Sequence, residues 1–157
     1  RASAAIKAAT GQKPVGFFCR GSESSWTRQL LASEGYFYTS NAFDDDLPYH
    51  DNSGLIVVPY NLDTNDMKFF HPNGFVRSAE MFEYVCDAVE QLMYEARAGK
   101  SSTLSIGFHL RISGRPARFR AVTKILEYLA DLDAQIWRAR RIDIARHFAA
   151  VCQTAKP

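Results

Sequence analysis

Short apolar runs alternate with polar loops and with longer segments of helical periodicity along this chain. The apolar runs are rich in β-forming residues and predict buried strands at 15–19, 36–39, 55–59 and 103–108, with a last short strand at 135–137. Strand, polar loop and helix recur about four times with no antiparallel return, which favours a largely parallel sheet. We therefore expect an α/β fold, either an open sheet or part of a barrel.

The remaining periodic segments predict helices at 2–9, 26–33, 78–98 and 141–152, and a further helix that starts at Pro116. Ser24 or Ser25 is expected to cap the second of these helices, and Ser78 the third. The positions expected to face inward follow the helical period. They are Leu30 and Leu31, then Phe82, Val85, Val89, Leu92, Met93 and Ala96, then Phe119, Val122, Ile125, Leu126 and Leu129.

Composition places the chain among globular proteins, because 46% of its 157 residues are hydrophobic and 13% are aromatic. The length fits one domain over 1–157, and a net charge of +2 does not favour a nucleic-acid partner. The sequence has no apolar run of membrane-spanning length, no recognisable signal peptide and no zinc-type spacing of its three cysteines. These features predict a cytoplasmic protein with reduced thiols and no membrane partner.

Candidate chemistry is concentrated after the strand predicted at 103–108. His109 and Arg111 lie two positions apart, so their side chains point the same way if the extended backbone continues. An imidazole beside a cation at the carboxyl end of a buried strand is typical of a general acid or base. The alternative is a histidine packed at a strand end and hydrogen-bonded to the backbone.

Asp63 and Asp66 follow the strand predicted at 55–59, with Asn65 between them. A carboxylate near an imidazole favours the charged form of the ring and fixes its tautomer, as a proton donor requires. The alternative is a pair of turn-capping aspartates. Because the carboxyl ends of neighbouring parallel strands meet at one edge, we expect these residues and His109 to form one site.

Other polar residues have weaker signals. The three acids at 44–46 are not expected to bind a metal, because consecutive side chains cannot all converge on one ion. Arg20 follows the first predicted strand and either reaches the same site or pairs with Glu23. A basic cluster is interpreted as the salt-bridged start of the last helix; it contains Arg138, Arg140 and Arg141 with Asp143.

Four motifs carry a resemblance to a known family. They are DDLPY at 45–49, VPYNLDTNDM at 58–67, LSIGFHLR at 104–111 with GRP at 114–116, and ARRIDIARH at 139–147. The chain resembles the allantoinase-like branch of the polysaccharide deacetylase (NodB homology) superfamily, in order and over nearly its whole length. The resemblance implies the second, carboxyl-terminal half of a distorted (β/α) barrel. The opening on Arg1 without a methionine agrees with the later part of a longer polypeptide.

The resemblance also implies roles for individual residues. His109 matches the histidine that protonates the leaving group, and Asp63 and Asp66 match the Asp-x-x-Asp motif that borders and tunes it. Arg20 matches the arginine of a middle motif loosely, since the branch has a Gly-Arg-Thr-Ser-Pro-like run where this chain has CRGSES at 19–24. The residues expected to contact substrate are Arg20, Asp46, Tyr60, Asn65 and Arg111.

In that superfamily an aspartate base and a metal held by one Asp and two His lie in the first half of the barrel. No cofactor or metal ligand is therefore expected within this chain, and a divalent metal such as zinc would be held by the missing half. The implied catalytic residues of this chain are His109, Asp63 and Asp66.

The function implied by the resemblance is hydrolysis of a non-peptide carbon–nitrogen bond in a small molecule, with ring opening of a cyclic ureide or imide preferred. The first alternative is a carbohydrate-metabolic deacetylase of N-acetylated sugars, of the chitin or peptidoglycan type. The second is a non-catalytic half-barrel. Since a half-barrel exposes two sheet edges, we expect a homo-oligomer or association with a complementary amino-terminal half. An active enzyme would also require the missing first half of the barrel.

Overall fold

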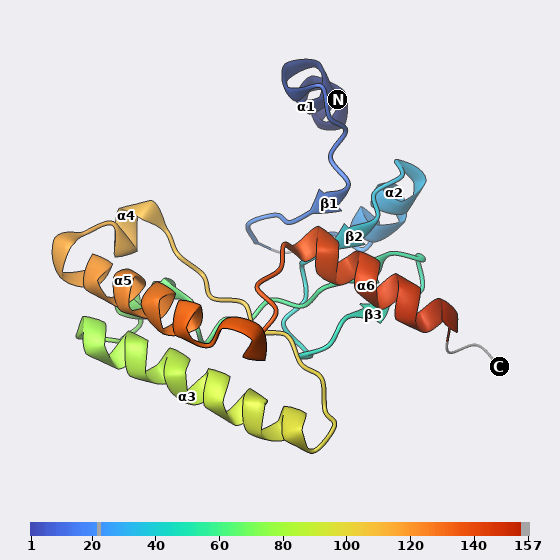
Figure 1. Ribbon diagram of the computed structural model, residues 1–157. Coiled ribbons are helices and arrows are strands. Elements are labelled where there is room, and N and C mark those ends of the chain that lie inside the picture. Colours follow the sequence, from blue (N-terminus) through green and yellow to red (C-terminus); the bar gives the residue numbers. More distant parts are fainter. Residues whose placement is uncertain (22, 155–157) are drawn as a thin grey trace. The chain divides into compact units, whose positions relative to one another are not determined.

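The computed structural model describes residues 1–21 and 23–154, and its helices and strands form a mixed α/β arrangement (Figure 1). The chain divides into two compact units, which are described separately. The sheet unit comprises Arg1–Tyr60 and Ala139–Pro157, and the helical unit comprises Asn61–Arg138. The α/β class expected from the sequence is confirmed, and a single domain over 1–157 stays a prediction.

The sheet unit contains four short strands, β1 (Gly16–Phe17), β2 (Tyr38–Thr39), β3 (Tyr49–His50) and β4 (Ile56–Val57). Their order is β1-β2-β4-β3, and β1, β2 and β4 are parallel. β3 is antiparallel to β4, so the expectation of no antiparallel return was wrong. A tight turn makes this return possible: Asp51 Oδ1 accepts the backbone N–H groups of Ser53 and Leu55, and Gly54 adopts a φ of +85°.

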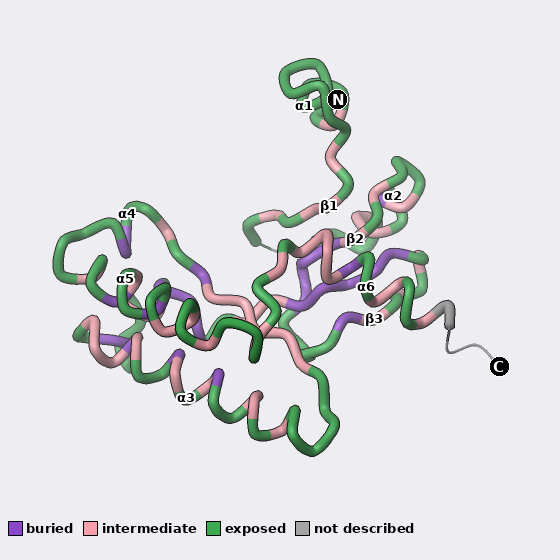
Figure 2. Tube along the Cα trace, in the orientation of Figure 1, coloured by how far each residue is buried: buried purple, intermediate pink, exposed green. Residues whose placement is uncertain are grey.

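Three helices complete the sheet unit, α1 (Ala2–Thr10), α2 (Thr27–Ser33) and α6 (Arg141–Thr154). α6 packs on β4, where Ile56, Val58 and Ala145 form a small buried core; the chain is buried from the end of β2 and along β4 (Figure 2). In α2 Leu31 is buried, whereas Leu30 is 61% exposed, so its predicted inward orientation was wrong. Adjacent helical positions point about 100° apart, and this short helix buries one narrow face.

The helical unit pairs two long helices, α3 (Ser78–Arg97) and α5 (Pro116–Asp131). Its shorter elements are the 3-10 helices η1 (Asp66–Phe70) and η2 (Asp133–Gln135) and the helix α4 (Leu110–Ser113). The core between α3 and α5 contains Phe75, Met81, Val85, Val89, Ala121 and Ile125. The inward orientation predicted for Phe119 and Leu126 was wrong, because both are more than half exposed. The buried stripe of α5 runs instead through Ala121 and Ile125, four residues apart.

The fourth predicted strand is not a regular element of the described structure, which has there an isolated parallel bridge between Asn65 and Gly107. Side chains take over part of the backbone pairing. Asn61 Oδ1 accepts the Ser105 N–H at 2.8 Å, and Thr64 Oγ1 donates to the Ser105 carbonyl at 2.6 Å. The apolar run is thus held in place beside the polar segment that carries Asn65, although it forms no ladder.

Other local predictions also differ from the structure. The strand predicted at 135–137 was wrong, because η2 extends to Gln135 and no strand is assigned to residues 136 and 137. Ser78 is the first residue of α3 rather than its cap; the Glu80 carboxylate instead accepts the N–H groups of Val76 and Arg77 at 2.7 and 3.1 Å. α2 starts without a side-chain cap.

Two further predictions concern whole-chain properties. Each of the three cysteines is a free thiol, as the sequence suggested. Among the described residues, no helix combines the length and apolar character needed to cross a membrane.

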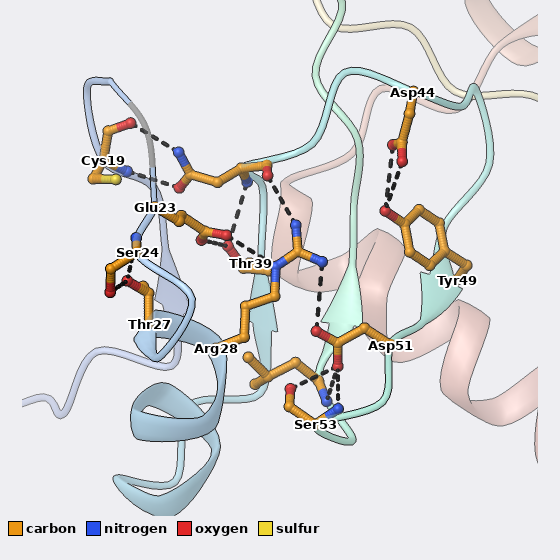
Figure 3. A network of polar contacts seen from close by, with 12 residues as sticks. Cys19, Glu23, Ser24, Thr27, Arg28, Thr39, Asp44, Tyr49, Asp51 and Ser53 are labelled. Atoms are coloured by element: carbon orange, nitrogen blue, oxygen red, sulfur yellow. Dashed lines mark hydrogen bonds and ion pairs between the residues drawn. The ribbon is translucent and has the colours of Figure 1, made fainter.

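A polar network joins the loop after β1, the end of β2 and the β3–β4 turn within the sheet unit (Figure 3). Arg28 of α2 lies at its centre: Nε is 2.9 Å from Glu23 Oε2, Nη1 is 3.5 Å from Asp51 Oδ2, and Nη2 donates to the Asn41 carbonyl. Glu23 also accepts a hydrogen bond from Thr39. Burial lowers the pKa of Arg28, but Glu23 raises it and the net change is upward. One guanidinium therefore compensates two carboxylates that are each only 11% exposed.

The same network fixes the loop that follows β1. The Asn41 side chain accepts the Cys19 N–H and donates to the Cys19 carbonyl, both at 2.8 Å, as a paired strand residue would. Glu23 anchors the other end of the loop through Arg28. Arg20, which the sequence places in this loop, is exposed, and the alternative that it pairs with Glu23 was wrong because Arg28 takes that carboxylate.

We predict that Arg28→Ala lowers the free energy of unfolding of the full-length protein by about 2 kcal/mol, because two partly buried carboxylates lose their cation. Arg28→Lys keeps the charge but not the forked geometry of the guanidinium, so its free energy of unfolding should lie between those of the wild type and Arg28→Ala. Urea unfolding measures the effect. Arg140→Ala is the matched control, since the Arg140–Asp143 ion pair is largely exposed and its loss should leave the midpoint nearly unchanged. Equal shifts for Arg28→Ala and Arg140→Ala would contradict the assigned role of Arg28.

Candidate functional site

The strongest concentration of polar contacts in the helical unit surrounds the carboxylate of Asp66, which is fully buried. Oδ2 accepts the backbone N–H of His109 at 2.6 Å and the hydroxyl of Ser113 at 2.6 Å. Oδ1 lies 2.7 Å from Nδ1 of the His109 ring. The prediction that an aspartate of the 63–66 motif contacts His109 is therefore confirmed for Asp66.

Local structure explains how these residues meet. Asn65 caps η1, because its Oδ1 accepts the Met67 N–H at 2.8 Å, and this places Asp66 at the first position of the 3-10 helix. The backbone bridge between Asn65 and Gly107 brings the two segments together, with the Asp66 N–H donating to the Gly107 carbonyl at 3.0 Å. His109 follows two residues later, as the residue that precedes α4.

The contacts of Asp66 determine which ring nitrogen of His109 is available. Oδ2 accepts the His109 N–H and the Ser113 hydroxyl, and the oxygens of a carboxylate act as acceptors. Nδ1 then carries the hydrogen that points to Oδ1, which leaves Nε2 as the nitrogen that exchanges protons. The His109 side chain is 36% exposed while that of Asp66 is 0% exposed, so the ring joins a buried anion to the surface. This arrangement suits a proton donor or acceptor. It differs from the alternative of a histidine that is hydrogen-bonded only to the backbone, because the ring contacts a carboxylate.

Asp63 has a different environment from Asp66. It is exposed, and its Oδ2 accepts a hydrogen bond from the Tyr84 hydroxyl at 3.3 Å. Burial raises the pKa of Tyr84, and the Asp63 carboxylate raises it further. Asp63 precedes η1 and turns toward α3, whereas Asp66 turns inward and takes the contact with His109. A catalytic role for Asp63 stays a prediction.

Arg111 does not share the orientation of His109, because α4 begins at Leu110 and the period-two argument needs an extended backbone. The exposed Arg111 guanidinium lies 3.7 Å from Met67 Sδ. Asn65 is buried with its amide oxygen engaged by Met67. Substrate contact by Arg111 and Asn65 stays a prediction.

The other three predicted substrate contacts, Arg20, Asp46 and Tyr60, belong to the sheet unit. Arg20 and Asp46 are exposed on loops. The Tyr60 ring packs against Phe18 with 5.5 Å between ring centroids, and the Arg141 guanidinium lies 5.1 Å from its centroid. Their contact with substrate also stays a prediction.

Arg141 is the residue whose position sequence reasoning missed. It was interpreted with Arg140 as part of a salt-bridged helix start, and that interpretation holds for Arg140, which pairs with Asp143 at 2.8 Å. Arg141 Nη1 instead donates to Ser40 Oγ and to the carbonyls of Val58 and Pro59 at 3.0–3.2 Å, where burial lowers the pKa of the guanidinium. Its place inside the ARRIDIARH motif was the available signal.

A metal site is not found among the described residues, where no group of three or more His, Cys, Asp and Glu side chains converges. In the acidic loop, Asp44 accepts a hydrogen bond from the Tyr49 hydroxyl and Asp45 Oδ1 accepts the Leu47 N–H at 3.0 Å. These are loop and turn contacts. A metal held by another part of the whole protein stays a prediction.

Comparison with known proteins gives a consistent result. No family model matches the chain. A Schizosaccharomyces pombe protein named "Putative polysaccharide deacetylase" is 34% identical over 125 residues, which cover 72% of this chain and 39% of that protein. The crystal structure of Puue allantoinase is similar with a TM-score of 0.84 and 41% identity, covering 95% of this chain and 50% of that one.

Two further crystal structures are similar to the chain. The "probable Polysaccharide deacetylase" of Pseudomonas aeruginosa PAO1 has a TM-score of 0.85 and 42% identity, over 95% of this chain and 51% of that one. A polysaccharide deacetylase-type structure from Mycobacterium smegmatis, with a TM-score of 0.75 and 24% identity over 99% and 55% of the two chains, supports the fold alone. The chain is thus a homologue of the polysaccharide deacetylases, with an allantoinase among its relatives, and it spans about half the length of their solved structures.

Proposed function

We propose that this chain supplies the proton-donating half of an active site that hydrolyses a non-peptide carbon–nitrogen bond. The observation that carries the proposal is the 2.7 Å contact between His109 Nδ1 and the buried Asp66 carboxylate. Because the chain spans about half of its solved relatives, the activity is proposed for the full-length protein.

Amide hydrolysis explains why such a pair is useful. Water adds to the carbonyl carbon and gives a tetrahedral oxyanion, and the carbon–nitrogen bond then breaks with its electron pair moving to nitrogen. Nitrogen is a poor leaving group unless it receives a proton, which the Nε2–H of the imidazolium form of His109 supplies. Asp66 stabilises that cation and holds the ring through Nδ1, a role like that of the aspartate in a catalytic triad. Asp66 itself is a positioning residue.

The group that takes the proton from water is assigned to the part of the barrel outside this chain. In the superfamily that the chain resembles, the metal ligands lie in that part as well, so zinc or a similar ion is also assigned there. No step of the proposal is derived through it.

We favour a cyclic ureide or imide as the substrate class, with ring opening as the reaction. The allantoinase relative supports this choice, at 41% identity over 95% of this chain. Cyclic ureides present carbonyl oxygens and ring N–H groups, which need both donors and acceptors. Arg20, Asp46, Tyr60, Asn65 and Arg111 are the side chains proposed to supply them.

Two alternatives are retained because specific observations favour them. The relatives named as polysaccharide deacetylases in Schizosaccharomyces pombe and Pseudomonas aeruginosa favour removal of acetyl groups from N-acetylated sugars. The half-length coverage favours a non-catalytic chain that pairs with an amino-terminal half or with a second copy. We also propose that the protein is cytoplasmic if its substrate is a cyclic ureide or imide.

We predict that His109→Ala in the full-length protein lowers kcat about 10²–10⁴-fold, because the leaving nitrogen loses its proton donor. Asp66→Asn should also lower kcat, since an amide neither stabilises the imidazolium nor fixes the same ring tautomer. Steady-state kinetics measures both effects.

His71→Ala is the matched control for this pair of variants. His71 is an exposed histidine at the end of η1 whose Nδ1 accepts the Asn73 N–H, so its loss should leave turnover unchanged. Near-normal turnover in His109→Ala would remove this histidine from the mechanism.

The product formed distinguishes the substrate classes. With allantoin and cyclic imides, the full-length protein should consume substrate and release a ring-opened acid, followed by mass spectrometry. Release of acetate from N-acetylated sugars, without ring opening, would select the deacetylase alternative instead. No product from either class would favour the non-catalytic alternative, and a native mass would then show whether a second polypeptide is bound.

A further inference from the structure

Ser113 is the member of the Asp66 cluster to which the proposed function gives no role. It lies at the last position of α4 and is 3% exposed. Its hydroxyl donates to Asp66 Oδ2 at 2.6 Å, the same oxygen that accepts the His109 backbone N–H. A buried hydroxyl is thus directed at a buried carboxylate that also holds the His109 ring.

The acceptor of this hydrogen bond is unusual for a helical serine, whose hydroxyl commonly donates to the backbone carbonyl one turn back. Here that carbonyl, of His109, accepts the backbone N–H groups of Ile112 and Ser113 at 2.8 and 2.9 Å. The hydroxyl instead crosses to η1 and joins residues 47 positions apart in the sequence. The contact is therefore tertiary, and it fixes the orientation of Asp66 rather than the local helix.

The two oxygens of Asp66 are used differently as a result. Oδ2 receives the Ser113 hydroxyl and the His109 N–H, and Oδ1 remains for the ring nitrogen. Three donors in a fixed arrangement prevent the carboxylate from rotating, and the ring follows the carboxylate.

We infer that Ser113 is a positioning residue that orients Asp66 Oδ1 toward His109 Nδ1 and so sets the direction of the imidazole. The effect of Ser113 on turnover rests on the proposed function. Its effect on the ring does not, because the cluster lies within the structure whatever reaction the whole protein performs.

The test compares Ser113→Ala with Thr64→Val in the full-length protein. Both variants remove one buried hydroxyl that donates at 2.6 Å, but the Thr64 hydroxyl bonds the Ser105 carbonyl and not the Asp66 carboxylate. Thr64→Val keeps the side-chain shape and matches the expected loss of stability. Only Ser113→Ala removes a donor from the carboxylate.

The first readout is NMR of protein labelled with ¹⁵N-histidine, in which His109→Gln assigns the His109 signals. The Nδ1–H proton held against a buried carboxylate should give a downfield resonance that exchanges slowly with water. In Ser113→Ala we expect its exchange to become about tenfold faster, while Thr64→Val keeps the wild-type rate. An unchanged resonance in Ser113→Ala, or an equal change in Thr64→Val, would overturn the inference.

The second readout is kinetic. Ser113→Ala should lower kcat about tenfold with KM within about twofold of wild type, because the ring is misdirected while the substrate contacts remain. Thr64→Val should keep kcat within about twofold of wild type. If the wild-type protein hydrolyses none of the substrates, the proposed function fails and the NMR comparison still decides the role of Ser113. If it does and Ser113→Ala keeps normal kcat, the positioning role fails alone.

Discussion

The buried carboxylate of Asp66 is the constraint on which the helical unit depends. A charged group without exposure destabilises a fold unless donors surround it, and Asp66 obtains three from the backbone and side chains of 109–113. The carboxylate belongs to η1, and its donors come from His109 and Ser113 at the two ends of α4. These helices have five and four residues and are too short to form alone. The carboxylate and these two short helices therefore stabilise one another, and the position of His109 is a consequence of the same contacts.

The site could be predicted from the sequence only as far as neighbouring residues determine it. His109 and Asp66 were both identified, because each follows an apolar run and belongs to a quoted motif. The sequence could not show which aspartate contacts His109, since Asp63 and Asp66 differ in burial and not in residue type. Arg111 was misplaced because the backbone changes from extended to helical at Leu110, a change that depends on tertiary contacts with Asp66.

The fold shows the same division between local and tertiary information. Long helices with strong periodicity, α3 and α5, were predicted within one residue of their starts. β3 was missed because no apolar run surrounds Tyr49–His50. The fourth apolar run has strand composition, yet side chains of Asn61 and Thr64 bind it in place of a ladder. The inward orientation predicted for Leu30 and Leu126 was wrong because hydrophobic residues are also common on protein surfaces.

A comparison of the two polar networks explains why chemistry is assigned to one of them. Arg28, Glu23 and Asp51 compensate one another's charges across the segments that they join, so that network serves to hold loops. The Asp66 cluster also compensates its charge internally, but it includes a partly exposed imidazole, a group that can both accept and donate a proton. A buried anion that is satisfied by neutral donors can stabilise a transient cation on that ring. This difference in titratable character, rather than the number of hydrogen bonds, separates a functional cluster from a structural one.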